Sequence, residues 1–427
     1  MTLIDLGDLA GAAAEPVAAP VNLPRLGKLA LAVLAVAGLL ALTASAPAAP
    51  ARVRSLWTAA FGPGDTMALD GPTLYLNRAG PDRRVEVTAY DLRTGRIRWS
   101  TPTGEAMSGH GLSPAGDVLL VATVSPRSVP GTLALDAATG RPLWRADGDA
   151  APSVATGDAL LAETGPSGAI TALRLVGLRD GDQRWRHAIA PAERWTPLTE
   201  DGRPATIVTM SATGDATVYG YEDGIARHRA RVPWNGVYSA TLLPVGPYFA
   251  VVRTSSAQTV ATVYGGTDLR PRWRSEELIG YVTGCGTLIC TAGVRGVTAR
   301  DAATGRERWR RDDMTFLWDV GGGRLLLSAA PNLASATTVL AEGATGRTIG
   351  SPIGGQQAIS AGAPGSVLLL RGTRTPPGRT AVYRLDLATG RLTVLGTVGR
   401  LAEQDCRGTP GYLVCPGGDR VTVTAVG

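Results

Sequence analysis

The sequence predicts an all-β fold: a β-propeller of about eight four-stranded blades, within a range of seven to nine, preceded by one N-terminal transmembrane helix. Three observations predict this class. A short turn motif recurs about every 42 residues along most of the chain. Alternating apolar runs, typical of half-buried strands, precede the motif. One long uncharged segment lies near the N-terminus.

The uncharged segment covers residues 29–51 and is rich in Leu, Val and Ala. With a rise of about 1.5 Å per residue, its most apolar part nearly crosses a hydrocarbon core of about 30 Å. Arg25 and Lys28 precede the segment, and Arg52 and Arg54 follow it. The flanking charges therefore do not set its orientation.

A cleaved signal peptide is the alternative, because Ala49-Pro50-Ala51 fits a small-x-small cleavage pattern. The leader before the span is long and carries three acidic residues (Asp5, Asp8 and Glu15), which signal peptides avoid. We therefore expect an uncleaved single-pass anchor.

The expected organisation has three parts. Residues 1–28 form a short, disordered cytoplasmic leader, residues 29–49 form the transmembrane anchor, and residues 55–427 form the propeller. No second span follows, so we expect the propeller on the extracytoplasmic side of the cell membrane.

The repeated motif reads Asp-x-x-Thr-Gly-x-x-x-Trp. The nearly complete copies contain Asp91, Thr94, Gly95 and Trp99; Asp136, Thr139, Gly140 and Trp144; and Asp301, Thr304, Gly305 and Trp309. Weaker copies keep Gly181 and Trp185; Gly224, with His228 at the tryptophan position; Leu269 and Trp273; Gly346; and Asp386, Thr389 and Gly390. We expect His228 to pack as the tryptophans do.

Each residue type in the motif has a physical role. The Asp side chain accepts backbone N–H bonds in a turn, and Thr does so more weakly. Gly adopts the positive φ that closes a tight hairpin. The Trp lies in the returning strand, where its large ring can pack against the neighbouring unit. About four strands per 42 residues is the size of one propeller blade.

This signature resembles the tryptophan-docking repeat of the quinoprotein (pyrroloquinoline quinone, PQQ) propellers. Their non-catalytic relatives include a propeller that scaffolds outer-membrane protein assembly. The resemblance covers about residues 55–427 and implies a propeller. It does not fix the function, because this fold carries both enzymes and binding platforms.

Ring closure is expected from both ends of the propeller. The segment around Trp57 resembles a returning strand without its hairpin, and residues 405–423 resemble the first three strands of a blade. One blade shared by both ends would satisfy edges that otherwise stay open. Eight hairpins plus this blade would make nine; we expect eight, which is common in the family, with one degenerate copy falling short of a full blade.

The four cysteines form two short pairs, Cys285 with Cys290 and Cys406 with Cys415, at equivalent places in their repeats. Pairing across adjacent strands would bring each pair within disulfide reach. Disulfides imply an oxidising compartment, in agreement with export. Free thiols and a metal site are the alternatives, although only three histidines occur in the chain.

Catalytic signatures are scarce. The quinoprotein enzymes hold PQQ over a Ca²⁺ ion bound by Glu and Asn, beside an Asp base and a disulfide of adjacent cysteines. This chain lacks a Cys-Cys pair, and its propeller has only Asn77, Asn235 and Asn332. We therefore assign no catalytic, cofactor-binding or metal-binding residue. Trp195, Trp234 and Trp318 lie outside the docking position and either line a ligand-binding face or pack between blades.

The function expected from these observations is a membrane-anchored, extracytoplasmic, non-catalytic scaffold that binds a protein or a cell-wall polymer. Its net charge of +6 is compatible with anionic partners. We expect no cofactor and no nucleic-acid partner, since aromatic and basic residues do not combine into such a site. The alternative is an enzyme, either an atypical quinoprotein dehydrogenase or a propeller that acts on polysaccharides.

Overall fold

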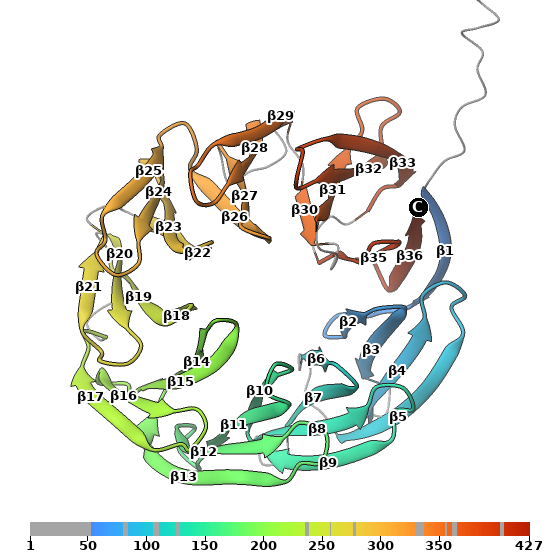
Figure 1. Cartoon of the computed structure of the whole chain (residues 1–427). Helices are drawn as coiled ribbons and strands as arrows, with labels where there is room; N and C mark the ends of the chain where they lie inside the picture. Colours follow the sequence, from blue (N-terminus) through green and yellow to red (C-terminus); the bar gives the residue numbers. More distant parts are fainter. Residues whose placement is uncertain are drawn as a thin grey trace, which may run out of the picture. The chain divides into compact units, whose positions relative to one another are not determined.

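The described part of the computed structural model is residues 53–427, without 80–83, 106–110, 125–128, 235–238, 257, 276–278, 330–336, 355–356, 361–364 and 402–404. This part forms a closed ring of nine four-stranded antiparallel sheets (Figure 1). We number the sheets as blades 1 to 9 along the chain. In each blade the first strand lies nearest the centre of the ring and the last strand lies outermost (Figure 1).

The first three blades are the following. Blade 1 contains β2 (Thr66–Asp70), β3 (Thr73–Ala79), β4 (Arg84–Asp91) and β5 (Ile97–Glu105). Blade 2 contains β6 (Leu112–Ala115), β7 (Val118–Val124), β8 (Pro130–Asp136) and β9 (Pro142–Asp147). Blade 3 contains β10 (Asp149–Ser153), β11 (Asp158–Thr164), β12 (Ile170–Gly177) and β13 (Gln183–Ala192).

The next three blades have the same plan. Blade 4 contains β14 (Arg194–Glu200), β15 (Arg203–Met210), β16 (Asp215–Gly220) and β17 (Ala226–Arg231). Blade 5 contains β18 (Ser239–Val245), β19 (Tyr248–Thr254), β20 (Thr259–Gly265) and β21 (Pro271–Arg274). Blade 6 contains β22 (Ile279–Cys285), β23 (Leu288–Gly293), β24 (Gly296–Asp301) and β25 (Glu307–Arg311).

The last three blades complete the ring. Blade 7 contains β26 (Phe316–Gly321), β27 (Arg324–Ser328), β28 (Thr337–Glu342) and β29 (Thr348–Gly354). Blade 8 contains β30 (Gln357–Ser360), β31 (Ser366–Gly372), β32 (Arg379–Asp386) and β33 (Leu392–Gly399). Blade 9 contains β34 (Arg407–Gly408), β35 (Tyr412–Gly417), β36 (Arg420–Val426) and β1 (Val53–Ala60).

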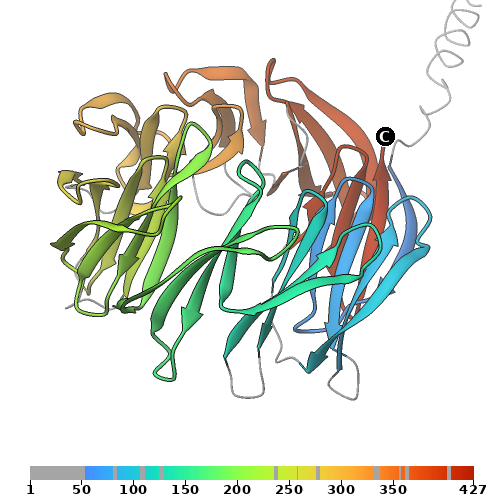
Figure 2. The ribbon, with the colours of Figure 1, turned by 60° about the horizontal axis from the view of Figure 1, so that its bottom comes forward.

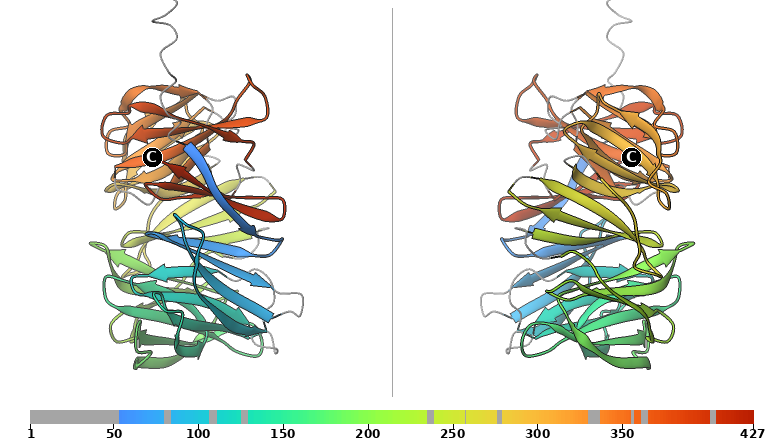
Figure 3. Two further views of the ribbon diagram at one scale, coloured as in Figure 1. Left: turned by 90° about the vertical axis from the view of Figure 1, so that its right-hand side faces the viewer. Right: turned by 90° about the vertical axis from the view of Figure 1, so that its left-hand side faces the viewer.

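Blade 9 joins the two ends of the propeller, as the sequence predicts. β1 pairs with β36 antiparallel, from Val53 opposite Val426 to Ala60 opposite Arg420. Figure 3 shows the blue β1 against the red strands that precede the C-terminus. The pairing gives β36 a partner on its outer side, so this sheet has four strands like the others.

The core is divided among the blade interfaces. One cluster of buried side chains lies between each pair of neighbouring blades in the described part of the chain. Leu, Val, Ile and Ala of the inner and middle strands supply most of these clusters, because strands covered on both faces carry continuous apolar runs. Figure 2 shows the blades standing side by side around the ring.

The predicted all-β propeller is confirmed, and its blade number is nine, the upper end of the predicted range. The expected number of eight is too low, because the degenerate hairpins at Gly346 and Gly390 each belong to a complete sheet. The predicted anchor, residues 29–49, and the leader lie outside the described residues. Within the described ranges, no helix is long and apolar enough to span a bilayer.

Candidate binding surface

The Asp and Thr of the motif are used to build turns. In blade 6 the Asp301 carboxylate accepts hydrogen bonds from the Thr304 N–H at 3.0 Å and the Thr304 hydroxyl at 2.8 Å. These bonds, together with Arg308, lower the pKa of Asp301 to about 2. The same Asp–Thr bonds occur at Asp91, Asp136 and Asp386. These carboxylates are therefore part of the turn scaffold.

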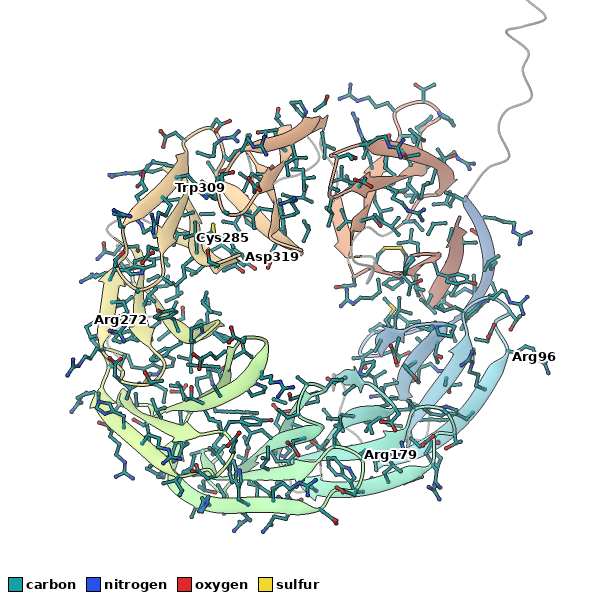
Figure 4. The ribbon with its side chains drawn as sticks, in the orientation of Figure 1. Arg96, Arg179, Arg272, Cys285, Trp309 and Asp319 are labelled. Atoms are coloured by element: carbon teal, nitrogen blue, oxygen red, sulfur yellow. A yellow bond between two sulfur atoms is a disulfide. The ribbon has the colours of Figure 1, made fainter. Side chains whose placement is uncertain are left out.

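The tryptophans join each blade to the next. Each of six indole N–H groups donates to a backbone carbonyl of the following blade, and Figure 4 shows Trp309 at the junction of blades 6 and 7. The donor–acceptor distances are 2.9 Å for Trp57–Leu92, 3.1 Å for Trp99–Ala137, 2.9 Å for Trp144–Leu178, 3.1 Å for Trp185–Tyr221, 3.3 Å for Trp273–Ala302 and 2.9 Å for Trp309–Gly343.

The motif glycines make room for these rings. All have positive φ, and a Cβ added at Gly140 would lie 2.4 Å from the Trp99 ring. Similar overlaps with the preceding tryptophan would occur at Gly95, Gly181, Gly224, Gly305 and Gly346. Gly390 instead lies against the backbone of Ile349 and Gly350.

The tryptophan contacts are interrupted at three interfaces. His228, Gly350 and Val394 stand at the tryptophan positions of blades 4, 7 and 8. The expectation that His228 packs is wrong, because its side chain is exposed. Opposite it, the glycine position holds Leu269, which is buried and keeps a positive φ of 55°. The buried Leu269 side chain belongs to the cluster between blades 4 and 5.

Both predicted cysteine pairs are disulfides. Cys285–Cys290 joins β22 to β23, with Cα atoms 5.8 Å apart. Cys406–Cys415 joins the residue before β34 to β35, with Cα atoms 4.2 Å apart. All four cysteines are buried. Each bridge links the two innermost strands of its blade, blades 6 and 9 respectively.

The two faces of the ring differ in their loops. The turns between the first and second strands, and the Thr–Gly turns between the third and fourth, lie on one face, here called the turn face. A groove of about 620 Å³ opens on this face between blades 3 and 4. Its lining includes Thr156 and Asp158 of blade 3, with Arg203, Tyr221 and Arg227 of blade 4. We call it the blade 3–4 groove.

A tyrosine hydroxyl lies buried at this groove. Tyr221 is only 2 % exposed, and its hydroxyl has no hydrogen-bond partner in the described part of the chain. Burial raises the pKa of Tyr221 to about 12; the nearby Thr156 hydroxyl opposes the shift, and the Asp158 carboxylate adds to it. At neutral pH this phenol therefore stays protonated and can donate a hydrogen bond.

The charges around the groove are partly paired. Arg184 lies 3.6 Å from Asp158, and Arg227 pairs with Asp223. The exposed Arg203 and Glu222 form no ion pair with any described residue. The lining thus combines a free guanidinium with a buried hydroxyl donor. The sequence did not predict these residues, since they come from different repeats and carry no motif.

Two further hollows open on the opposite face. One, of about 470 Å³, lies beside Glu193, Arg194 and Trp195, and the other, of about 660 Å³, lies between blades 9, 1 and 2. Of the tryptophans outside the docking position, Trp195 lines the first hollow, whereas Trp234 is buried and packs between blades. Trp318 contacts Phe316, whose ring in turn stacks on Tyr281 of blade 6.

The residues do not fit the quinoprotein cofactor site. In the described ranges, no group of three or more His, Cys, Asp or Glu side chains is placed to hold a metal ion. The two disulfides span five and nine positions, so neither joins adjacent cysteines. The buried Asn77 belongs to the β2–β3 pairing of blade 1.

Comparison with known proteins places the chain in a family. Residues 49–263 match the family model described as outer membrane protein assembly factor BamB, which is built on PQQ-like repeats. The chain belongs to this PQQ-like propeller family. No curated protein is significantly similar to this PQQ-like propeller.

Several solved structures are similar to this PQQ-like propeller at low sequence identity. A eukaryotic initiation factor is 10% identical, with a TM-score of 0.55, over 82% of this chain and 93% of that one. BamB from Moraxella catarrhalis is 14% identical, with a TM-score of 0.43, over 87% of this chain and 99% of that one. A europium-containing methanol dehydrogenase is 13% identical, with a TM-score of 0.42, over 88% of this chain and 93% of that one.

Proposed function

We propose that this chain is a membrane-anchored, extracytoplasmic scaffold that binds a protein partner without catalysing a reaction. Membership in the family described as an outer membrane protein assembly factor carries the proposal. The fold supports it, because the repeated Asp, Thr, Gly and Trp residues are engaged in turns and blade contacts. Grooves on both faces remain for a partner.

The anchored, exported placement rests on the uncharged segment 29–49 and agrees with the two disulfides. Alkaline phosphatase fused after residue 427 should be active in intact cells, and phosphatase fused after residue 28 should be inactive. N-terminal sequencing of the mature membrane protein should begin before residue 29. Activity of the second fusion, or a mature start near residue 52, would contradict the anchored topology.

Partner binding is tested by crosslinking the full-length protein in its native membrane and identifying the captured proteins. The control is residues 1–54 fused to an unrelated exported domain. Enrichment of one or more envelope proteins over this control supports the scaffold, and no enrichment contradicts it. Dye reduction after addition of PQQ and Ca²⁺ would contradict the non-catalytic role.

A further inference from the structure

The blade 3–4 groove combines residues that lie far apart in the sequence. Thr156 lies in the turn between β10 and β11 and Asp158 begins β11, whereas Arg203 and Tyr221 come from blade 4. The docked Trp185, whose indole N–H donates to the Tyr221 carbonyl at 3.1 Å, holds the two blades together here. Beside Trp185, a ring nitrogen of His187 lies 2.9 Å from the Asp223 carbonyl oxygen. Two contacts therefore fix the groove walls relative to each other.

Two donors at the groove lack acceptors. A buried hydroxyl without a partner loses its hydration and gains no hydrogen bond in return, so a native protein rarely keeps one without a reason. Among the residues that the structure describes, the Tyr221 hydroxyl has no hydrogen-bond partner and the Arg203 guanidinium forms no ion pair. A carboxylate accepts bonds from both kinds of donor, and guanidinium pairs with it in a planar, two-bond geometry.

The remaining charges restrict the ligand further. Three Arg (184, 203 and 227) and three acidic residues (Asp158, Glu222 and Asp223) line the groove, so its formal charge is zero. A polyanion would meet the three carboxylates and gain little net attraction. Leu175, Pro204 and Ala205 add apolar surface that suits an aliphatic stem. A peptide with an isolated carboxylate fits this mixture better than an anionic polymer or a lipid surface.

We propose that the blade 3–4 groove binds a carboxylate-bearing peptide segment of the partner protein, with Arg203 as the ion-pairing residue and the Tyr221 hydroxyl as the hydrogen-bond donor. The inference rests on the proposed scaffold function and names the chemistry that its partner presents. The carboxylate belongs either to a Glu or Asp side chain or to a C-terminus, two sources that share the same chemistry.

Fluorescent pentapeptides test the groove, using the full-length protein in detergent and fluorescence anisotropy. One peptide carries a central Glu with both ends blocked, the second carries Gln instead, and the third is neutral with a free C-terminal carboxylate. We expect the first or the third to bind and the Gln peptide to bind at least about tenfold more weakly. Equal binding of the Gln peptide, or no binding of any of the three peptides, would overturn the inference.

Variants locate the site. Arg203→Glu should weaken binding about tenfold or more, and Tyr221→Phe should weaken it severalfold without lowering the thermal midpoint, since the lost hydroxyl has no partner. The matched control is Arg96→Glu, the same charge change on an exposed residue of blade 1 (Figure 4), which should leave affinity within twofold. An equal loss in Arg96→Glu, or no loss in Arg203→Glu, would overturn the groove as the site.

The membrane crosslinking experiment separates this inference from the proposed function. If Arg203→Glu captures fewer partners than Arg96→Glu, the groove is supported. If both variants capture partners like the unmodified protein, the groove is the wrong site while the scaffold function stands. If the unmodified protein captures none, the scaffold function itself fails.

Discussion

The indole N–H of Trp57 donates to the carbonyl of Leu92 at 2.9 Å, and the Trp57 ring also stacks on Tyr90 with centroids 5.4 Å apart. Trp57 belongs to β1 of blade 9, whereas both partners belong to blade 1. The contact that links ordinary neighbouring blades therefore also links the blade that closes the ring. Closure uses the same chemistry as every other tryptophan junction.

Replacing Trp57 by Ala should destabilise the propeller. The change removes a half-buried aromatic ring and a hydrogen bond at the closing junction, so we expect a loss of about 3–5 kcal/mol in the free energy of unfolding. Urea unfolding followed by fluorescence measures the loss. The control Ile97→Ala changes an exposed side chain and should shift stability by less than about 0.5 kcal/mol; equal effects would contradict a role for Trp57 in closure.

Gly140→Ala tests the space needed by a docked tryptophan. The new Cβ would lie 2.4 Å from the Trp99 ring, at a φ of +72°. Gly157 has the same φ of +72°, but nothing lies within 4 Å of its would-be Cβ. Gly157→Ala should therefore cost only about 1 kcal/mol for the backbone conformation, and Gly140→Ala at least about 2 kcal/mol more. Similar thermal midpoints for the two variants would show that the rings are not tightly docked.

The turn carboxylates should make stability fall in strong acid. The Thr hydroxyl bonds, together with an arginine at each turn, lower the pKa values of Asp91, Asp136 and Asp301 to about 2 in the folded protein, below the ordinary value of 3.8. A depressed pKa means that the folded state is favoured above about pH 4, and that this contribution is lost as the pH falls towards 2. The thermal midpoint should decline across this window.

One substitution isolates the cause at Asp301. Thr304→Val removes the hydroxyl that contributes most to the shift, so the Asp301 pKa should rise towards its ordinary value. Carboxyl NMR titration of the unmodified protein and the variant measures the change. An unchanged pKa in the variant would assign the shift to Arg308 and the backbone instead.

The two disulfides should differ in importance. Cys285–Cys290 reinforces a hairpin whose strands, β22 and β23, have seven and six residues. Cys406–Cys415 holds β34, which has only two residues, in the closing blade. Replacing Cys406 and Cys415 by Ala should cost about 2–4 kcal/mol, and the Cys285/Cys290 double replacement should cost less. Urea unfolding of both variants checks the order, and the reverse order would contradict it.

A double-mutant cycle tests the interrupted junction between blades 4 and 5. His228→Trp alone should not stabilise the protein, because the buried Leu269 occupies the glycine position opposite. Combined with Leu269→Gly, the new tryptophan should find room to dock. We expect a favourable coupling energy of about 1 kcal/mol or more from the thermal midpoints; simple additivity would show that this junction cannot accept the motif.

The sequence best predicted those features that depend on residues close together along the chain. Asp301, Thr304 and Gly305 lie within five positions, so their turn could be predicted from residue types alone. The blade number was harder, because Gly350 and Val394 replace the tryptophans that mark a junction, although their sheets are complete. The blade 3–4 groove could not be predicted, since Thr156 meets Tyr221 only when two blades pack together.

The pairing of β1 with β36 has a consequence for biogenesis. About 360 positions separate these strands, so β1 has no pairing partner until β36 has been synthesised. Blades 1 to 8, each built from consecutive strands, can form during synthesis, but the ring closes only when β36 pairs with β1. A translation product that ends before β36 would thus leave β1 without its partner, with a strand edge free to pair with other chains.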